Sequence, residues 1–448
     1  MRKTWWLPLL ALAAALPALA AQTSMFDRLA LDRLAAKHAD VVRYAAARKS
    51  LPPPQGLQDL RAIIHVHSFL SHDSRGTKQQ IAAAAKASGT RVVMLSDHVS
   101  KEHDYYRDGF QGTYEGVLFI PGAETRGFLL YPQAPLDPTQ PASQQALLDA
   151  VLATGGVAFA SHVEGWPTSD WPLVGLTGME LYNHHYDRVD RAEMRELEDA
   201  MTERPVATPD ATAKMVLLAK ALRQYPQETF AFVQDVATPY LAAFDRESQR
   251  HRLTAISAND THAHWGVVVK AGPNGTLISQ GPLGDPMAAL DPAQLGDLLP
   301  AAPTPGQTVF ELLLDSYERS FRHTSTHLLA PALDPEHVLQ ALRMGHAYVA
   351  FDWIADPRGF SFQAQGAGHP VLMGDEVALR SGLTLTAALP LPAQLRLLRN
   401  GAPVPLPAAP SARLSHRVTQ PGVYRLEAHL SVGGEMFPWI YSNPIYVR

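Results

Sequence analysis

The stretch Leu60-Arg61-Ala62-Ile63-Ile64-His65-Val66-His67-Ser68 guides the interpretation of the whole 448-residue chain. Its apolar run predicts a buried strand, and two histidines stand at the end of that strand. Strand side chains alternate with a period of two, so His65 and His67 share one side and one metal ion can take both. Alone the pair is weak evidence, because composition gives about one such motif by chance, and a second pair stands at His262 and His264.

The pattern of apolar runs that begins at Leu60 continues along the chain. Short apolar runs alternate with segments of helical spacing such as 78–87, a pattern that predicts a largely parallel sheet. The runs that follow Ala62-Ile63-Ile64 are Val92–Leu95, Val117–Ile120, Val157–Ala160, Met179–Tyr182 and Leu253–Ile256. We therefore expect an α/β fold in which the strands form a barrel.

Potential metal ligands follow one predicted strand after another. They are His98 after 92–95, Glu124 after 117–120, His162 after 157–160, and Asp260 with His262 after 253–256. Each alone is as readily a structural histidine, a helix cap or a surface charge. Together they predict a metal site, because strand ends converge on one face of an α/β barrel and buried carboxylates and imidazoles are costly unless paired or bound to metal. A set without sulfur suits zinc, manganese or iron.

The first residues predict export. Arg2 and Lys3 precede an apolar stretch from Trp5 to Leu16 and the small residues around Ala20 and Ala21, so residues 1–21 are interpreted as a signal peptide and the chain as periplasmic or secreted. The alternative is a membrane anchor, for which the run is short. The chain has no cysteine for disulfides or lipidation.

Charge argues against one class of partner. The net charge of −5 comes without a run of lysines and arginines, so nucleic acid is not expected as a partner. We also expect no stable membrane insertion, while the oligomeric state is left open.

The remaining domain organisation is predicted from local residue patterns. Residues 22–56 predict a helical segment and linker, and 57–365 a barrel that carries a helical insertion at 187–250 and a long, partly irregular excursion at 267–305. Helical spacing returns at 309–317 and 335–344. Alternation and turn signals in the last part predict a small β-sandwich domain over 366–448.

The motifs together resemble the PHP (polymerase and histidinol phosphatase) family over roughly residues 60–264. The residues that carry the resemblance are His65-Val66-His67-Ser68, Asp73, Ser96-Asp97-His98, Pro121-Gly122-Ala123-Glu124, His162 and Asp260-Thr261-His262. The resemblance implies a distorted (β/α)7 barrel with two or three divalent metal ions. It implies one metal at His65, His67, Glu124 and Asp260, a second at Glu124 and His162, and a third at Asp73, His98 and His262.

One departure concerns the second metal. Relatives with three metals carry another histidine shortly after the glutamate, whereas this chain has Arg126-Gly127-Phe128-Leu129-Leu130, and His184 or His185 is the available substitute. The distal segments 341–352 and 439–447 resemble the exported, carbaryl-hydrolase-like branch of these metalloenzymes.

The expected chemistry is hydrolysis of a small-molecule ester by a metal-activated water near Glu124 and Asp260. We expect Asp97 to orient a ligand histidine rather than act as a base. Arg126 is the first candidate to stabilise transition-state charge, with Arg75 and Arg322 beside His323 as further candidates. A phosphoesterase is the leading hypothesis, the alternatives being a carboxyl-ester, amide or carbamate hydrolase and a non-catalytic metal-containing binding protein.

Overall fold

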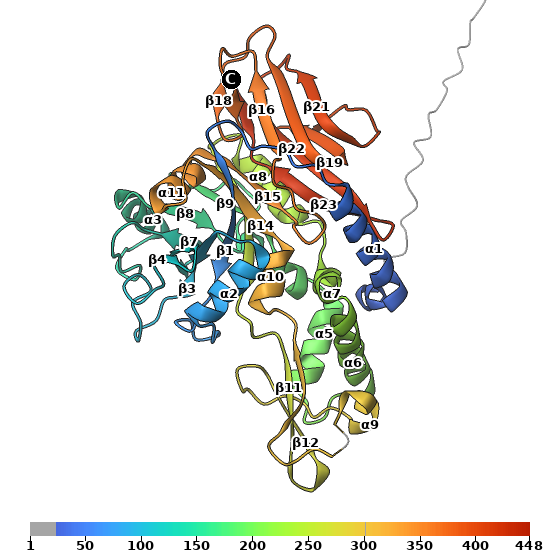
Figure 1. Cartoon of the computed structure of the whole chain (residues 1–448). Helices are drawn as coiled ribbons and strands as arrows, with labels where there is room; N and C mark the ends of the chain where they lie inside the picture. Colours follow the sequence, from blue (N-terminus) through green and yellow to red (C-terminus); the bar gives the residue numbers. More distant parts are fainter. Residues whose placement is uncertain (1–23, 301) are drawn as a thin grey trace, which may run out of the picture.

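The computed structural model of the chain describes residues 24–300 and 302–448, so the signal peptide expected at 1–21 lies outside the described residues. In Figure 1 a region of sheet and helices lies in the middle, an all-β region lies above it, and an elongated helical and β unit lies below. The helix η1 (Met25–Leu29) and the helix α1 (Leu31–Ala47), expected from the N-terminal pattern, precede the first strand.

The middle region is a sheet in which each strand pairs with the next. Strand β1 pairs in parallel with β2, β2 with β5, β8 with β9, β9 with β10, and β10 with β1; β3 pairs in parallel with β6, and β7 joins β6 to β8 through antiparallel pairs. The bounds are β1 Gln58–Val66, β2 Val92–Leu95, β3 Asp97–His98, β5 Val117–Ile120, β6 Ala123–Thr125, β7 Phe128–Tyr131, β8 Val157–Ala160, β9 Gly178–Asn183 and β10 Thr254–Thr261. The mixed α/β class is confirmed, while the barrel stays a prediction.

The helices around this sheet begin and end where local chemistry requires. Helix α2 (Lys78–Ser88) starts with a capping box between Thr77 and Gln80 and stops at Gly89, which adopts a φ of 73°. Helix α11 (Pro335–Met344) has the predicted bounds. The remaining elements of this region are β4 Gly112–Tyr114, α3 Gln144–Ala153, η2 Val163–Gly165, α10 Tyr317–His323, β14 Ser325–Ala330 and β15 Ala347–Ala350.

Helices occupy most of the segment 187–250, and some of them pack beside a small sheet. Met194, Leu197 and Met215 of the helices share a hydrophobic core with Val267 and Val269 of the sheet. We call this group of elements, residues 192–224 and 266–313, the accessory unit; it lies below the main sheet in Figure 1. The insertion comprises α4 His184–Val189, α5 Ala192–Thr202, α6 Pro209–Gln224, α7 Pro226–Phe230, η3 Ala231–Val233 and α8 Thr238–Glu247.

One prediction in the accessory unit is wrong and another agrees with the structure. The excursion at 267–305 is partly irregular, as predicted, and its regular part includes β11 (Gly266–Ala271), which pairs with β12 (Leu277–Gln280) and with β13 (Thr308–Leu313) in an antiparallel sheet. The helix expected at 309–317 is strand β13, and the helix follows only at α10. The short helices in this part are η4 Pro273–Gly275, α9 Pro292–Leu295 and η5 Gly296–Leu298.

The C-terminal region consists mainly of antiparallel strands, with one parallel pair between β18 and β24. Its long strand β19 (Thr384–Arg399) pairs through its first half with β16 and β21 and through its second half with β20 and β22. Strand β23 (Glu435–Ser442) pairs with β15 of the middle region. One hydrophobic core runs from Leu148 and Tyr182 to Leu385 and Trp439, which ties the two regions together. The other bounds are β16 Ser361–Gln365, β17 Val371–Leu372, β18 Glu376–Val377, β20 Ala402–Val404, β21 Ser411–Arg417, β22 Gly422–Val432 and β24 Ile445–Val447.

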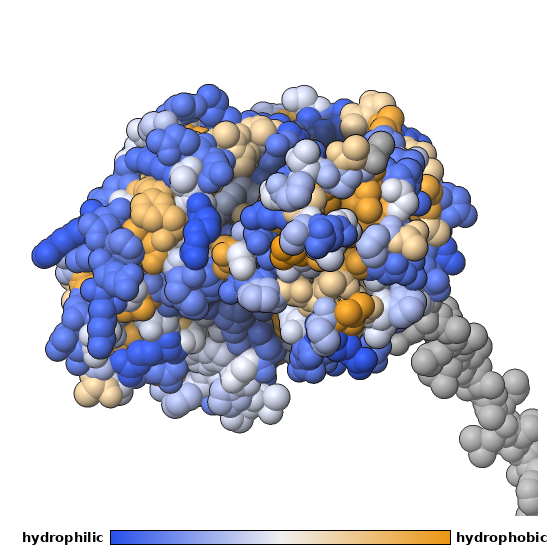
Figure 2. Space-filling view, turned by 90° about the horizontal axis from the view of Figure 1, so that it is seen from below, coloured by the Kyte–Doolittle hydropathy of each residue, from blue (hydrophilic) through white to orange (hydrophobic). Residues whose placement is uncertain are grey.

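The surface in Figure 2 shows apolar residues in several separate patches among hydrophilic ones. Within the described ranges, no helix combines the length and the apolar character needed to cross a membrane.

Candidate metal centre

The eight ligand candidates from the sequence come together at the ends of the middle strands. His65 is the last residue but one of β1, His67 follows directly after the strand, His98 ends β3, and Glu124 lies in β6. His162 lies just beyond the end of β8, and Asp260 and His262 lie at the end of β10. Asp73 lies in the loop before α2. Convergence of strand ends thus gathers residues that are almost 200 positions apart in the chain.

The first group is formed by His65, His67, Glu124 and Asp260, whose ligand atoms all lie within 4.8 Å of one another. Nε2 of His65 lies 3.2 Å from Glu124 Oε2 and 3.2 Å from Asp260 Oδ1. Nε2 of His67 lies 3.5 Å from the same two oxygens.

Three atoms of this group are buried and lack a hydrogen-bond partner among the described residues: Nε2 of His65, Nε2 of His67 and Oδ1 of Asp260. Buried polar atoms are rarely left unsatisfied. Imidazole nitrogens and carboxylate oxygens are ligands that zinc, manganese and iron accept, so this donor set fits a divalent cation.

The second group adjoins the first and shares His67 with it. Its other members are Asp73, His98 and His262, again with all ligand atoms within 4.8 Å. Oδ2 of Asp73 lies 3.3 Å from Nε2 of both His98 and His262. The two groups are adjacent enough for two cations to share ligands.

His162 contacts the opposite side of the first group. Its Nε2 lies 2.9 Å from Glu124 Oε1 and 3.5 Å from Asp260 Oδ2. Glu124 therefore presents one oxygen to His65 and His67 and the other to His162, which is the bridging position that the resemblance implies.

Backbone conformation distinguishes three of the candidate ligands. His65, His162 and Asp260 have φ values of 67°, 48° and 48°. Residues other than glycine rarely adopt this left-handed region, and such strain concentrates at functional sites. The fold holds these side chains in place at a local cost.

Hydrogen bonds fix the ring orientation of the two leading histidines. Nδ1 of His65 donates to Glu180 Oε1 at 2.7 Å, and Glu180 is fully buried. Nδ1 of His67 lies 3.0 Å from the hydroxyl of Ser71, which donates in turn to Asp97. Protons on both Nδ1 atoms leave both Nε2 lone pairs facing the site. Asp97 thus supports His67 through Ser71, rather than acting directly on a ligand ring.

The electrostatic field of the site is negative. Burial lowers the pKa of His65, but the charges of Asp260, Glu124 and Glu180 outweigh it and raise the pKa well above its usual range. Burial and the nearby His262 lower the pKa of His67 to about 3, which keeps its ring neutral at pH 7. The same field that stabilises a proton on His65 would attract a cation, whose binding displaces that proton.

The guanidinium groups of the arginines singled out in the sequence are engaged by other partners. Arg126 is exposed and donates to the carbonyl oxygen of Pro141, while Arg75 donates to the carbonyl oxygens of His72 and Ser74. Arg322 pairs with Glu318 on its own helix. The charge-stabilising roles predicted for them receive no support from these contacts.

Arg188 is the guanidinium that shares a cavity lining with Asp260, and the sequence analysis missed it. It donates to Nδ1 of His185 at 3.2 Å. A ring that accepts at Nδ1 carries its proton on Nε2 when neutral. His185 therefore offers a hydrogen-bond donor rather than a free lone pair, which argues against its substitution as a ligand in this arrangement.

The sequence analysis also did not select Glu180 as a functional residue, although its position in the sequence pointed to one. It is a charged residue inside the otherwise apolar run Met179–Tyr182, and a fully buried carboxylate needs partners. Those partners are the rings and backbone of the site: besides His65 it accepts from the backbone N–H of His162 at 2.9 Å.

No protein-family model and no curated protein matches the chain. Among solved structures, the chain is similar to a two-domain protein from Bacteroides vulgatus that contains a predicted PHP-like metal-dependent phosphoesterase. The match has 14% sequence identity and a TM-score of 0.33, and it covers 89% of this chain and 98% of the other. A likeness at this level carries no argument, so the assignment of function rests on the site.

Proposed function

We propose that this chain is a divalent-metal-dependent hydrolase and that phosphate esters are its substrates. The observation that carries the proposal is the set of buried, unpartnered atoms on His65, His67 and Asp260, which face one another within reach of a single ion. Two adjoining ligand groups also suit phosphate esters, since pairs of cations stabilise both the attacking and the leaving oxygen of an in-line displacement. The PHP resemblance of the sequence points to the same chemistry.

A bound cation supplies Lewis acidity, which activates water and withdraws charge from the ester. The residues of the chain supply the geometry. Glu180 and Ser71 hold the rings of His65 and His67, while Glu124 and Asp260 fix the spacing between the two sides of the site. The rigid strand ends keep these groups aligned while substrate enters and product leaves.

The pairing of β10 with β1 supports a barrel of the (β/α)7 type as the scaffold, which we include in the proposal. We also propose, from residues 1–21 of the sequence, that the protein is exported.

A second candidate is a carboxyl-ester, amide or carbamate hydrolase on the same site. The observation that favours it is that the guanidinium groups of Arg75, Arg126 and Arg322 are engaged by backbone carbonyl oxygens or by Glu318. A neutral ester needs no such cation, whereas phosphate recognition commonly uses arginine forks.

The test is a panel of 4-nitrophenyl phosphate, bis(4-nitrophenyl) phosphate, 4-nitrophenyl acetate and a 4-nitrophenyl carbamate. Each is assayed with zinc-, manganese- and iron-loaded protein. Asp260→Asn is the site variant, and Asp210→Asn is the control, because the Asp210 side chain is 75% exposed and pairs with Lys214 on its own helix. We expect phosphate ester turnover that Asp260→Asn abolishes and Asp210→Asn preserves.

The other outcomes of this assay distinguish between the remaining hypotheses. Turnover of acetate or carbamate without any phosphate ester would replace the leading proposal by the second candidate. Stoichiometric metal binding without turnover of any substrate would make the chain a binding protein and refute both hydrolase assignments.

A further inference from the structure

A carboxylate outside the two ligand groups lies behind the ring of His162. Nδ1 of His162 donates to Glu164 Oε1 at 3.2 Å, while Nε2 of the same ring lies 2.9 Å from Glu124 Oε1. A neutral ring that carries its proton on Nδ1 has its lone pair on Nε2, the atom that faces the site. Glu164 therefore stands to His162 as Glu180 stands to His65.

Glu164 is itself held by a residue of the helical insertion. The hydroxyl of Tyr240, on α8, donates to Glu164 Oε2. Tyr240 is fully buried in the core that joins the middle and C-terminal regions, whereas the Glu164 side chain is 27% exposed. A packed ring fixes the position of its hydroxyl, so Tyr240 restrains a carboxylate that could otherwise turn toward solvent.

The backbone of the same turn leaves His162 little freedom. Its φ of 48° is left-handed, and its N–H donates to Glu180 Oε2 at 2.9 Å. Its carbonyl oxygen accepts from the N–H of Gly165 at 2.9 Å, which closes the turn η2. The backbone and the ring of His162 are thus both fixed by contacts within the protein, and the ring is preorganised for a cation.

We propose that Glu164 is a positioning residue for His162 and that Tyr240 fixes Glu164, so that the helical insertion builds one side of the metal centre. The inference rests on the proposed hydrolase function, because it concerns a cation held between Glu124 and His162. It also bears on the histidine that is missing after Glu124. A ring that is already held in place loses little freedom when a cation binds, which offsets the smaller number of ligands.

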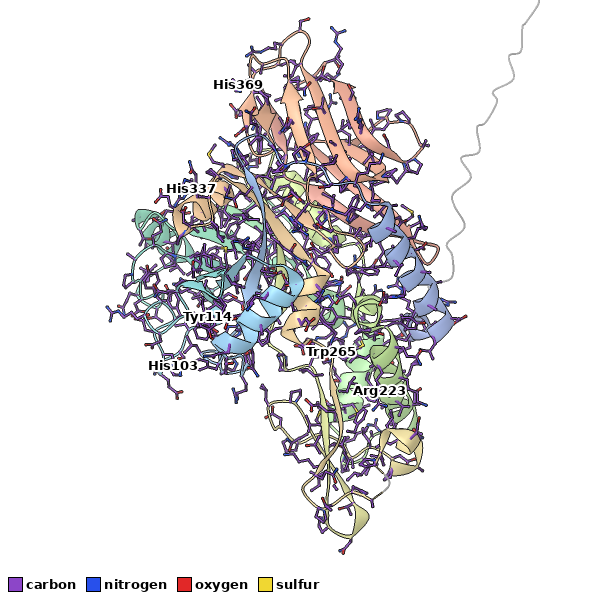
Figure 3. All side chains as sticks on the ribbon, in the orientation of Figure 1. His103, Tyr114, Arg223, Trp265, His337 and His369 are labelled. Carbon is purple, nitrogen blue, oxygen red and sulfur yellow. The ribbon has the colours of Figure 1, made fainter. Side chains whose placement is uncertain are left out.

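The test titrates the metal-free full-length chain with Mn²⁺ and follows the EPR signal of the free ion, which counts the bound cations and gives the affinity of each without turnover. Glu164→Ala removes the carboxylate, and Tyr240→Phe removes only the hydroxyl. The control Asp334→Ser removes the carboxylate behind His337, to which Nδ1 donates at 2.7 Å, and keeps a capping hydroxyl on α11. That pair has a similar exposure, and Figure 3 labels His337 at the side of the molecule.

We expect Glu164→Ala to weaken one cation about tenfold or more, as is typical when a carboxylate behind a ligand histidine is lost. Tyr240→Phe should weaken the same cation about threefold or more, as the loss of one hydrogen bond predicts, and Asp334→Ser should stay within about twofold of the wild type. Glu164→Gln should bind more tightly than Glu164→Ala, because its amide oxygen can still accept from Nδ1 while its NH₂ group donates to the Tyr240 hydroxyl.

A double-variant comparison separates positioning from a general effect on the fold. His162→Asn removes the ring, and asparagine tolerates the left-handed backbone. In that background Glu164→Ala should leave the Mn²⁺ titration unchanged, because Glu164 acts only through His162. A further loss in that background would overturn the inference.

Thermal melting identifies the folded variants. A folded Glu164→Ala that binds every cation within about twofold of the wild type would overturn the inference, and the same result for Tyr240→Phe would overturn the part assigned to α8. If Glu164→Ala does not fold, Glu164→Gln and Tyr240→Phe decide by the same measure. A wild-type protein that binds no cation would refute the proposed function itself, whereas binding that does not depend on Glu164 refutes only its positioning role.

Discussion

Replacing Glu180 with glutamine tests whether the buried hydrogen bond to His65 prepares the site for a cation. Oε2 of Glu180 accepts from the backbone N–H of His162 and from Asn183 Nδ2, at 2.9 and 3.1 Å. Glutamine keeps these two bonds if its oxygen stays at that position. Its NH₂ group then faces the Nδ1–H of His65, which now donates at 2.7 Å to Oε1. Two donors cannot face each other, so the ring must move its proton to Nε2, the atom that faces the site.

The expected loss follows from that change of tautomer. Removing such a supporting carboxylate typically costs 10–100-fold in metal affinity, or about 1.4–2.7 kcal/mol. Competition for zinc against a chelator at pH 7.5 measures the loss. The control is Glu247→Gln, an equally conservative change at a carboxylate that is 1% exposed and pairs with Arg246. An affinity of Glu180→Gln within twofold of the wild type, with the protein folded, would refute the role assigned to Glu180.

Two further predictions concern stability and export. Burial lowers the pKa of His327, but the charge of Asp59 and hydrogen bonds to Asp352 and Asp59 outweigh it and raise the pKa to about 9, above the ordinary 6.5. The resulting stabilisation of the folded state, roughly 3 kcal/mol, is fully present below pH 6.5 and is lost as the pH rises through 9. The free energy of unfolding, measured with urea from pH 6 to 10, should show this fall, and His327→Gln should remove this pH dependence. N-terminal sequencing of protein recovered outside the producing cell should begin after Ala20 or Ala21, and an intact Met1 would contradict the predicted cleavage.

Most of the ligand candidates could be singled out because they follow short apolar runs, whereas Asp73, in the loop before α2, was indicated only by the family resemblance. A run such as Val157–Ala160 is too short for a helix, and its residues are buried on both faces of the sheet. A polar residue that follows such a run lies where the strand ends. In the structure His162 lies two residues after β8, whereas Glu124 lies within β6, a separate short strand that the apolar run did not predict. Positions in the sequence could not show that Glu124 faces two sides of the site, because side-chain direction depends on contacts between strands.

The accessory unit was harder to predict. The segment Thr308–Leu313 contains apolar residues at spacings that fit a helix as well as a strand, and its strand conformation depends on pairing with β11, about 40 positions earlier. Contacts between segments, rather than local preference, decide such cases. Arg188 was missed for the same reason, since its partners Glu198 and Trp265 come from two different elements.

The pairing of β15 with β23 also bears on how the protein is made. Strand β15 is complete at Ala350, but its partner is the segment Glu435–Ser442, about 85 positions later in the chain. Until that segment emerges, the growing chain presents an unpaired strand edge, which is a template for association with other chains. Completion of the sheet therefore lags behind the synthesis of β15 by the whole intervening segment, and chaperones should be needed over that interval.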